Sequence, residues 1–394
     1  MLIKNKSVAI VGGGPGGLTL AKLLQMKGVE VKVYERDLNE NARVQGSLLD
    51  LHQDSGLAAI RAAGLLEVFK ESFMIGADKT LIMDENAKVW LSDHESEPNE
   101  DFGEEHFRPE IDRGTLRKIL LNSLQENTVV WNSHFLSMKK ENEGWLLHFE
   151  NRDPVYADMV IGCDGARSKV RPYITEIKPF YTGITMLEGN VPDALINAPE
   201  INKILMGGKI MAFGNHKNLL IGQKGKGEIG FYASFKADEK WTSTNGVDYS
   251  DKNEIIHWYK KAYPEWNSIW LELFENAEIP FIPRPIYCMP FDQYWKPLHN
   301  ATIMGDAAHV MPPFAGEGAN MAMKDALDLS ECLTSETYST VQEAIAGYEA
   351  EMFRRASAAA KESVENGETM HSEKALQSMI DFFGSFKGSE EERK

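Results

Sequence analysis

The sequence predicts an α/β fold: a parallel sheet with flanking helices, an inserted and mostly antiparallel β-sheet domain, and C-terminal helices. Three observations predict it. Residues 8–36 run through strand, glycine loop, helix and strand, which is one βαβ unit. Between residues 172 and 285 helical periodicity becomes rare and alternating strands recur. From residue 301 onward, a buried strand and amphipathic helices return the chain to the first pattern.

The βαβ unit contains a glycine-rich loop between its first strand and its helix. Gly12, Gly14 and Gly17 satisfy the pattern G-x-G-x-x-G. The first glycine allows the tight turn, the second lets backbone approach a pyrophosphate, and the third lets the helix pack against the strand. The free N–H groups at the helix start face an anion. The pattern therefore predicts a Rossmann-type nucleotide-binding domain. Its candidate contacts are Gly12, Gly14, Pro15, Gly16 and Gly17.

An acidic residue ends the second strand of this unit. Glu35 follows Gly14 by roughly 20 residues, where a carboxylate can accept a hydrogen bond from a ribose hydroxyl. Arg36 comes next and is a further candidate contact. Because Glu35 would repel a phosphate on that ribose, we expect the bound group to be the ADP part of FAD or NAD.

Composition and charge exclude several classes of function. The net charge is −17, from 42 basic and 59 acidic residues, whereas a nucleic-acid partner needs a basic face. No apolar run approaches the roughly 20 residues of a membrane span, and the first strand begins too early to leave room for a signal peptide. The three cysteines form no C-x-x-C motif and are interpreted as reduced thiols. We expect a cytoplasmic protein without bound metal, and a monomer because no stretch demands a partner.

A histidine and two arginines lie near the starts of predicted helices. His52 precedes a helical pattern at residues 55–69, and a capping or hydrogen-bonded structural role is favoured over a role as a ligand. Arg113 and Arg117 lie at the start of another helix. Basic residues there oppose the helix dipole and usually need an anion or a carboxylate. A bound anion and a surface ion pair stay equally open.

A second glycine turn follows the buried strand at residues 157–163. Asp164 and Gly165 close this strand at the carboxyl edge of the sheet, where cofactors lie in open α/β folds. Three strands of a predicted meander come before it, at residues 129–131, 135–138 and 145–149.

The inserted domain is predicted to be a sheet whose inner face lines a cavity or a core. Strands are expected within residues 80–90 and at 182–189, 203–213, 218–222 and 228–235, with helices near 253–263 and 266–274. The inward side chains are expected to be Met186, Met211, Phe213, Ile221 and Phe231, for which a core role is the default.

A proline- and glycine-rich turn follows the strand at residues 301–304. Residues 305–309 read Gly-Asp-Ala-Ala-His, and the two prolines at 312–313 fix an extended approach to the next helix. Gly316 and Gly318 bring backbone N–H groups to the start of that helix.

These motifs together resemble those of the single-component FAD-dependent aromatic hydroxylases, which have the p-hydroxybenzoate hydroxylase fold. The glycine loop, the Asp164–Gly165 turn and residues 305–313 occur in the family's order across nearly the whole chain. Within the family, four segments look most like the tetracycline-inactivating flavin monooxygenases, also called tetracycline destructases. They are residues 34–37, 49–52, 168–171 and 311–316.

The resemblance implies roles in binding FAD. Glu35 would bind the adenosine ribose, Arg113 would contact the cofactor, and Asp306 would hold the ribityl chain. Gly46 and Asp50 would lie near the flavin. These roles are implied by the resemblance to the family; they do not follow from composition or spacing.

The resemblance also gives the proline turn a role. Residues 313–318 would place a helix N-terminus against the flavin pyrimidine edge, which becomes negative on reduction. Arg43 and Arg167 are candidates for the phosphates of a transient NADPH. The remaining cofactor candidates are Arg36, Asp164, Gly165, Gly305, Pro313, Gly316, Gly318, Ala319 and Asn320.

A hydroxylation reaction follows from the same resemblance. NADPH or NADH reduces FAD, O₂ adds to give a C4a-hydroperoxide, and its distal oxygen passes to an electron-rich carbon of a phenolic or polycyclic substrate. No side chain is expected to act as acid or base, and the protein must exclude water. Two other classes stay open: a flavin reductase or dehydrogenase on the same scaffold, and a protein that sequesters an antibiotic.

Substrate contacts are expected from the inserted sheet and from the proline turn. The tetracycline-inactivating enzymes have a glutamine, an arginine, a methionine and a histidine where this chain has Glu188, Lys209, Met211 and Gly230. Only the methionine matches, so tetracycline is one candidate beside other polycyclic or phenolic compounds. The candidate substrate contacts are Glu188, Lys209, Met211, Ile221, Phe231, Pro313, Phe314, Ala315 and Gly316.

The motifs and the change in pattern predict three units. The FAD-binding domain is expected to comprise residues 1–72, 107–172 and 286–335, and the substrate-binding domain residues 73–106 and 173–285. The C-terminal unit, 336–394, is expected to hold helices near 341–365 and 373–383.

Overall fold

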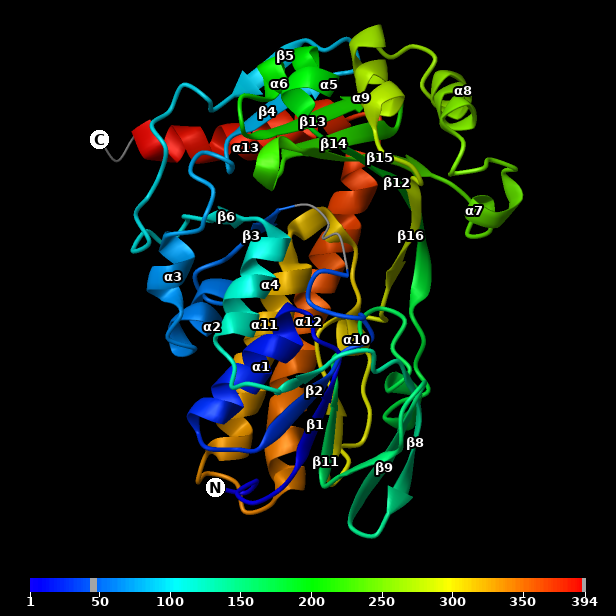
Figure 1. Ribbon diagram of the computed structural model, residues 1–394. Helices are drawn as coiled ribbons and strands as arrows, with labels where there is room; N and C mark the ends of the chain where they lie inside the picture. The colour runs from blue at the N-terminus through cyan, green and yellow to red at the C-terminus, as the bar shows by residue number, and fades with distance from the viewer. Residues whose placement is uncertain (43–47, 392–394) are drawn as a thin grey trace.

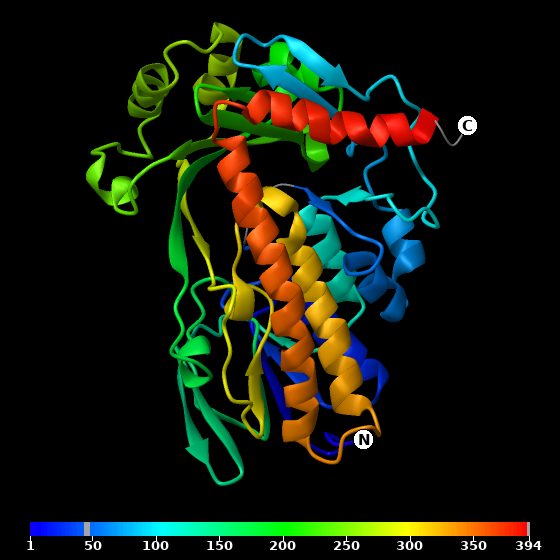
Figure 2. The same cartoon turned by 180° about the vertical axis from the view of Figure 1, so that it is seen from behind.

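The computed structural model describes residues 1–42 and 48–391, and side chains as far as residue 385. The predicted α/β fold is confirmed: a body with a parallel sheet lies below a second, larger sheet, and the long helix α12 (Val341–Met370) joins the two (Figures 1 and 2). Arg43 and Gly46, which were expected to contact FAD and NADPH, lie outside the described residues.

The lower body is built on a five-stranded parallel sheet in the order β17-β11-β1-β2-β7. Its strands are β1 (Val8–Val11), β2 (Val31–Tyr34), β7 (Val129–Val130), β11 (Met159–Gly162) and β17 (Ala301–Ile303). Each strand is mostly apolar, as expected where helices or loops cover both faces of a parallel sheet.

The prediction that residues 129–131 belong to a meander was wrong. Val129 pairs with Val33 at the edge of the parallel sheet, and both residues of the strand are half-buried, because both faces of such a sheet are covered at least in part. The separate antiparallel sheet consists instead of β8 (Phe135–Glu141), β9 (Gly144–Phe149) and β10 (Val155–Ala157).

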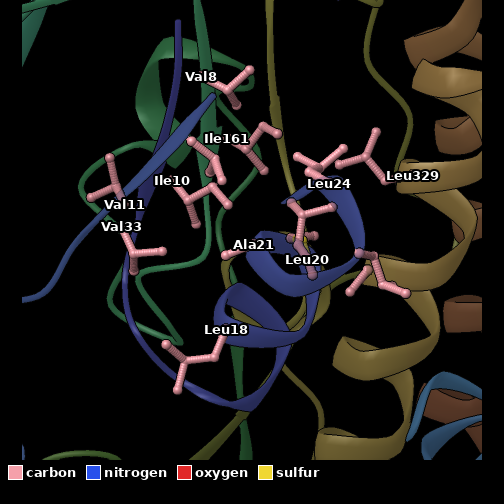
Figure 3. Packing of buried hydrophobic residues seen from close by; sticks show 14 of the residues in the cluster. Val8, Ile10, Val11, Leu18, Leu20, Ala21, Leu24, Val33, Ile161 and Leu329 are labelled. Atoms are coloured by element: carbon pink, nitrogen blue, oxygen red, sulfur yellow. The ribbon is translucent and has the colours of Figure 1, made fainter. Parts of the chain in front are cut away.

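Helices pack against the parallel sheet and bury its apolar residues. Ile10, Val33 and Ile161 from three strands lie against Leu20 and Leu329 from two helices (Figure 3). Burying one such side chain contributes roughly 1.5–3 kcal/mol. The helices of this body are α1 (Pro15–Met26), α2 (Gly56–Ala62), α3 (Leu66–Lys70), α4 (Arg113–Asn122), α10 (Asp306–His309) and α11 (Glu317–Thr334). The single helix expected at 55–69 is two helices, because Gly64 between them has a φ of 70°.

The upper body is a seven-stranded sheet in the order β16-β12-β15-β14-β13-β4-β5. All its neighbours are antiparallel except β13 and β4. The strands are β4 (Thr80–Asp84), β5 (Val89–Ser92), β12 (Phe180–Val191), β13 (Lys209–Gly214), β14 (Lys217–Gln223), β15 (Ile229–Lys236) and β16 (Ile282–Cys288). The expected strand 203–213 begins only at Lys209, because Pro199 starts a helix, α6 (Pro199–Leu205), that ends just before two glycines.

The two faces of the upper sheet have different surroundings. The outer face packs under α5 (Ala194–Asn197), α6, α8 (Lys252–Ala262) and α9 (Leu271–Asn276), with Phe231 and Phe274 in edge-to-face contact. A further short helix is α7 (Trp241–Thr244). The inner face looks toward the lower body, and α13 (Ala375–Glu391) lies along part of it (Figures 1 and 2).

A small two-stranded sheet lies between the bodies. β3 (Leu49–Asp50) pairs antiparallel with β6 (Glu110–Ile111), opposing Asp50 to Glu110. This pairing brings two acidic residues from distant parts of the sequence to the level at which the upper and lower bodies meet (Figure 1).

Candidate functional site

The glycine loop is shaped by close contacts at two glycines and is open at the third. A Cβ built on Gly12, whose φ is 109°, would lie 2.3 Å from the carbonyl oxygen of Cys163. A Cβ on Gly17 would lie 2.2 Å from the carbonyl oxygen of Gly12. By contrast, a Cβ on Gly14 meets no atom of the described residues within 4 Å. Gly12 and Gly17 therefore serve packing, and Gly14 leaves room for a ligand to approach the backbone.

The start of α1 offers hydrogen-bond donors to an anion. Gly14 is the N-cap, has no side chain to cap the helix, and is followed by Pro15 at the first helical position. The early N–H groups of an α-helix have no intrahelical partner. Gly16, the other loop candidate, lies against Ala322 of α11. The N-terminus of α1 thus has the form expected of a pyrophosphate site.

Glu35 anchors the loop from the end of β2. Its Oε2 accepts a hydrogen bond of 2.6 Å from the backbone N–H of Gly13, and its Oε1 accepts one of 3.0 Å from that of Asp37. This carboxylate lies at the end of β2, where an acidic residue binds the ribose hydroxyls of a dinucleotide in folds of this type. Arg36 is exposed next to it.

The two arginines at the start of α4 have different surroundings. Arg117 forms an ion pair of 3.0 Å with Asp37 and lies 5.3 Å from the centre of the Trp131 ring. Arg113 has a buried Nε without a hydrogen-bond partner among the described residues; the guanidinium nitrogens of Arg117 also make no hydrogen bond there, but Arg117 has its ion pair. Arg117 therefore has the carboxylate partner that was expected for a basic residue at a helix start. Arg113 is left with a buried donor of the kind that a bound anion would satisfy.

The Asp164–Gly165 turn is held by its own side chain. The Asp164 carboxylate accepts hydrogen bonds from Ser168 Oγ and from the backbone N–H groups of Lys169, at 2.7 Å, and Val170, at 3.2 Å. Gly165 has a φ of 82° and open space where a Cβ would be. The carboxylate shapes the turn, so a contact with a cofactor would come from the backbone at Gly165.

A buried charged cluster that sequence reasoning missed holds the Gly305–Asp306 turn. The backbone N–H of Gly305 donates to Asp325 Oδ2 at 2.9 Å, and the same carboxylate pairs with His309 and Arg355 at 2.5 and 2.8 Å. Arg171 also holds the turn, donating to the carbonyl oxygens of Asp306 and Ala307. Asp325 and Arg355 lie within helical patterns that gave no signal for such a role.

The Asp306 side chain lies beside the proline turn. A Cβ on Gly318 would lie 3.9 Å from its Oδ1. Burial raises the pKa of Asp306, and the charges of His309, Arg113 and Arg171 oppose that rise. Asp306 and Arg113, both assigned to FAD by resemblance, therefore lie close enough to interact electrostatically.

Residues 49–52 and 313–320 meet, although they are far apart in the sequence. A Cβ on Gly316, whose φ is 70°, would lie 3.2 Å from both carboxylate oxygens of Asp50. The Asn320 amide donates to the carbonyl oxygens of Asp50, at 2.8 Å, and Gly316, at 3.2 Å, and its Oδ1 accepts from the backbone N–H of His52. Pro313 and Ala315 belong to the 3₁₀ turn just before Gly316, and Ala319 lies in the first turn of α11.

His52 lies between two carboxylates. Its Nε2 is 3.1 Å from Asp50 Oδ2 and its Nδ1 is 3.3 Å from Glu317 Oε1. Burial alone would lower the pKa of His52, but the hydrogen bonds to the two acids raise it to about 9. His52 is thus hydrogen-bonded, in agreement with the favoured interpretation, and carries a positive charge at neutral pH.

Some expected substrate contacts share the inner face of the upper sheet. Met211 packs with the inner-face cluster, and Lys209, two residues earlier on β13, is on the same side. Glu188 pairs with Arg284. Phe314 joins the same apolar cluster and contacts the His371 ring edge-on.

Two expected substrate contacts were wrong. Ile221 and Phe231 belong to the core between the sheet and its outer helices. The reason is register: side chains alternate along a strand, so residues one position away from an inner-face residue point outward. Leu220 and Tyr232 occupy the inner positions instead.

Lys209 pairs with Glu110, next to Asp50. Burial raises the pKa of Glu110 to about 7, and Lys209 opposes that rise. Burial would lower the pKa of Lys209, but the carboxylates of Glu110 and Asp50 raise it overall. Gly222 lies opposite Lys209 on β14, and among the described residues a Cβ there would have one neighbour, Lys209 Cγ at 4.0 Å. The inner face therefore has a cation beside a position with free space.

Two kinds of feature are absent from the described residues. No helix in that part of the chain is long and apolar enough to cross a membrane. No three His, Cys, Asp or Glu side chains there lie close enough together to hold a metal ion.

Comparisons with known proteins agree with this geometry. The monooxygenase penA of Penicillium thymicola is 26% identical over 410 residues, covering 90% of this chain and 93% of its own length. The 6-methylsalicylate 1-monooxygenase atA of Aspergillus terreus is 27% identical, covering 89% of this chain and 79% of its own length. The crystal structure of tetracycline destructase Tet(51) shares the fold with a TM-score of 0.70 and 19% identity, covering 97% of this chain and 95% of that one.

The family model described as "FAD binding domain" matches residues 5–245 and 296–363, which is most of the chain. The predictions of FAD as cofactor and of an FAD-dependent monooxygenase are confirmed by this match and by the relatives. The chain belongs to the FAD binding domain family.

Proposed function

We propose that this FAD-dependent monooxygenase uses NAD(P)H and O₂ to hydroxylate a phenolic or polycyclic small molecule. One observation carries the proposal. Asp50 meets the Gly316 turn at the start of α11, below a sheet face that bears Lys209 and Met211. A flavin at this turn would have its reactive ring between the lower body and that face.

The residues present fit FAD. The open loop at Gly14 and the start of α1 would take the pyrophosphate, and Glu35 the ribose. The unpartnered Nε of Arg113 and the carboxylate of Asp306 would bind the middle of the cofactor. When bound, FAD supplies the redox chemistry: it accepts a hydride from NAD(P)H, activates O₂ and transfers one oxygen atom to the substrate.

The chain itself would bind and orient the substrate and keep water out. Met211, Leu220 and Phe213 give the inner face an apolar character suited to an aromatic ring. The ammonium group of Lys209, which pairs with Glu110, would also bind an acidic hydroxyl of the substrate as its anion. An ionised hydroxyl makes the ring more electron-rich, which favours attack by an electrophilic oxygen.

Tetracyclines are one member of this class, because they are polycyclic and carry acidic hydroxyl groups. The shared fold with a tetracycline destructase supports testing them. Glu188 is paired with Arg284, so it offers a different surface from the glutamine that the tetracycline enzymes have there. For NAD(P)H, Arg167 is exposed and is our candidate for a phosphate contact.

An oxygen-isotope experiment tests the proposed function. The purified protein, loaded with FAD and given NADPH or NADH under ¹⁸O₂, is screened with phenols, indoles and tetracyclines by mass spectrometry. A product heavier by one ¹⁸O atom supports the proposal. Oxygen or NAD(P)H consumption without an oxygenated product would favour the reductase, and tight ligand binding with unchanged NAD(P)H oxidation would favour sequestration.

A further inference from the structure

A positive charge is built into the start of α11 by two acids on opposite sides of one ring. Both nitrogens of His52 lie within hydrogen-bond distance of a carboxylate oxygen, of Asp50 on one side and Glu317 on the other. A neutral imidazole can donate from only one nitrogen. Acceptors on both sides of the ring favour its doubly protonated form, in agreement with a pKa raised to about 9.

The ring is fixed in position and largely shielded from water. His52 is 6% exposed, its backbone N–H donates to Asn320, and its carbonyl oxygen accepts from Leu57. Glu317 is the first residue of α11, and its Oε2 is buried without a hydrogen-bond partner among the described residues. Without His52, two acids would thus lie at the positive end of the helix, where they would weaken its effect on any other anion.

We propose that His52 is a positioning residue of the flavin site, which neutralises Asp50 and Glu317 so that the N-terminus of α11 favours the negative charge of reduced flavin. The inference rests on the proposed function in taking FAD as the group bound at the Gly316 turn. Charges that face the trio from other elements are Arg108 just before β6, Glu110 in β6 and Lys209 on β13.

The test is a charge-compensation cycle in the FAD-loaded protein. H52Q removes the cation, E317Q removes one acid, and H52Q/E317Q removes both. The midpoint potential is measured by anaerobic reductive titration against a dye, the dissociation constant of oxidised FAD by fluorescence, and the melting temperature by circular dichroism. H257Q, at an exposed position on α8, is the matched histidine control.

We expect H52Q to weaken binding of reduced relative to oxidised FAD about tenfold, a shift of about 30 mV for two electrons. E317Q should shift the potential in the opposite direction, and the double variant should lie near wild type. H257Q should leave the potential unchanged.

A merely structural His52 would lower the melting temperature without this pattern of signs. The inference would be overturned if FAD-loaded H52Q kept the wild-type midpoint potential. It would also be overturned if the midpoint potential of the double variant were as low as that of H52Q. If H52Q does not fold, E317Q alone decides it: a raised potential supports the inference and an unchanged one overturns it. Wild-type protein that cannot take up FAD would instead refute the proposed function.

Discussion

Asp325 accepts a hydrogen bond from the backbone N–H of Gly305 at 2.9 Å, and so links α11 to the turn that carries Asp306. The same carboxylate pairs with His309 and Arg355 and is almost fully buried. The Asp325 side chain therefore links the charged cluster on α11 to the position of Asp306, the proposed contact with FAD.

Removing the charge of Asp325 is expected to destabilise the fold and to weaken FAD binding together. Asp325→Asn keeps an acceptor for Gly305 but leaves the buried His309 and the partly buried Arg355 with less compensation, at a cost of about 3–5 kcal/mol. Urea unfolding and flavin content measure the two effects. Asp328 is a more exposed partner of Arg355, so Asp328→Asn should lower the free energy of unfolding by about 1 kcal/mol or less. Equal losses in both variants would contradict the role of Asp325.

Two alanine substitutions in the glycine loop should separate folding from cofactor binding. Gly12→Ala forces a Cβ to within 2.3 Å of the Cys163 carbonyl and should destabilise even the FAD-free protein. Gly14→Ala meets open space, so the FAD-free melting temperature should stay near wild type while FAD affinity falls at least tenfold. Calorimetry of the FAD-free variants and FAD titration distinguish them. Wild-type FAD affinity in Gly14→Ala would show that the pyrophosphate lies elsewhere.

Asp306→Ala should lower FAD occupancy. It removes a carboxylate that would accept a charge-assisted hydrogen bond, which is worth roughly 1.5–3 kcal/mol. Flavin absorbance per protein after purification measures the change. Asp292→Ala, on an exposed loop, is the control and should bind FAD normally. Normal flavin content in Asp306→Ala would count against the assigned role.

Lys209 should determine the affinity for ionisable substrates. Lys209→Met removes the cation from the inner face and should weaken binding of an acidic phenol about tenfold or more, while an uncharged analogue should be affected little. Lys209→Arg should retain part of the affinity because it keeps the charge. Difference spectra of the bound flavin report binding, and Lys203→Met, exposed on α6, is the control. Equal losses for acidic and uncharged ligands would refute the proposed recognition.

Acid should destabilise the junction between α12 and α13 through His371. Burial lowers the pKa of His371 to about 4 from its ordinary 6.5, so the unfolded chain takes up the proton first. The neutral ring therefore stabilises the fold above pH 6.5, and this contribution is lost as the pH falls toward 4, by about 3 kcal/mol at most. The free energy of unfolding, measured with denaturant between pH 6.5 and 4, should depend less on pH in His371→Gln than in wild type. His257→Gln should follow the wild-type curve, and an unchanged slope in His371→Gln would exclude His371 as the cause.

Local sequence rules predicted the parts of the molecule that depend on neighbouring residues. Gly12, Gly14 and Glu35 were assigned from spacing, and the structure gives them the geometry of a nucleotide loop. The parts that failed depend on pairing between distant strands. Val129 was assigned to the wrong sheet, and Phe231 to the wrong face, because a one-residue change of register reverses the direction of every side chain.

The charged partners in the site could not be predicted for a related reason. Asp325 and Glu317 lie on α11, and the sequence pattern of this helix predicts only which of its faces is apolar. Their partners His309 and His52 come from other segments. Nothing in a single sequence fixes which acid meets which base when the contact joins segments that fold from far apart.

The length of α12 has a consequence for how this protein can vary. Its 30 residues span about 45 Å. Tyr348 near one end donates to the Ile303 carbonyl of the lower sheet, whereas the Met370 carbonyl at the other end accepts from Asn218 of the upper sheet. Inserting one residue between them would turn the far end by about 100° and separate it from its partners. Insertions in the loops of either body would leave this spacing unchanged, whereas an insertion in α12 would alter it. We therefore expect related chains to keep the length of this helix even where its solvent-facing residues differ.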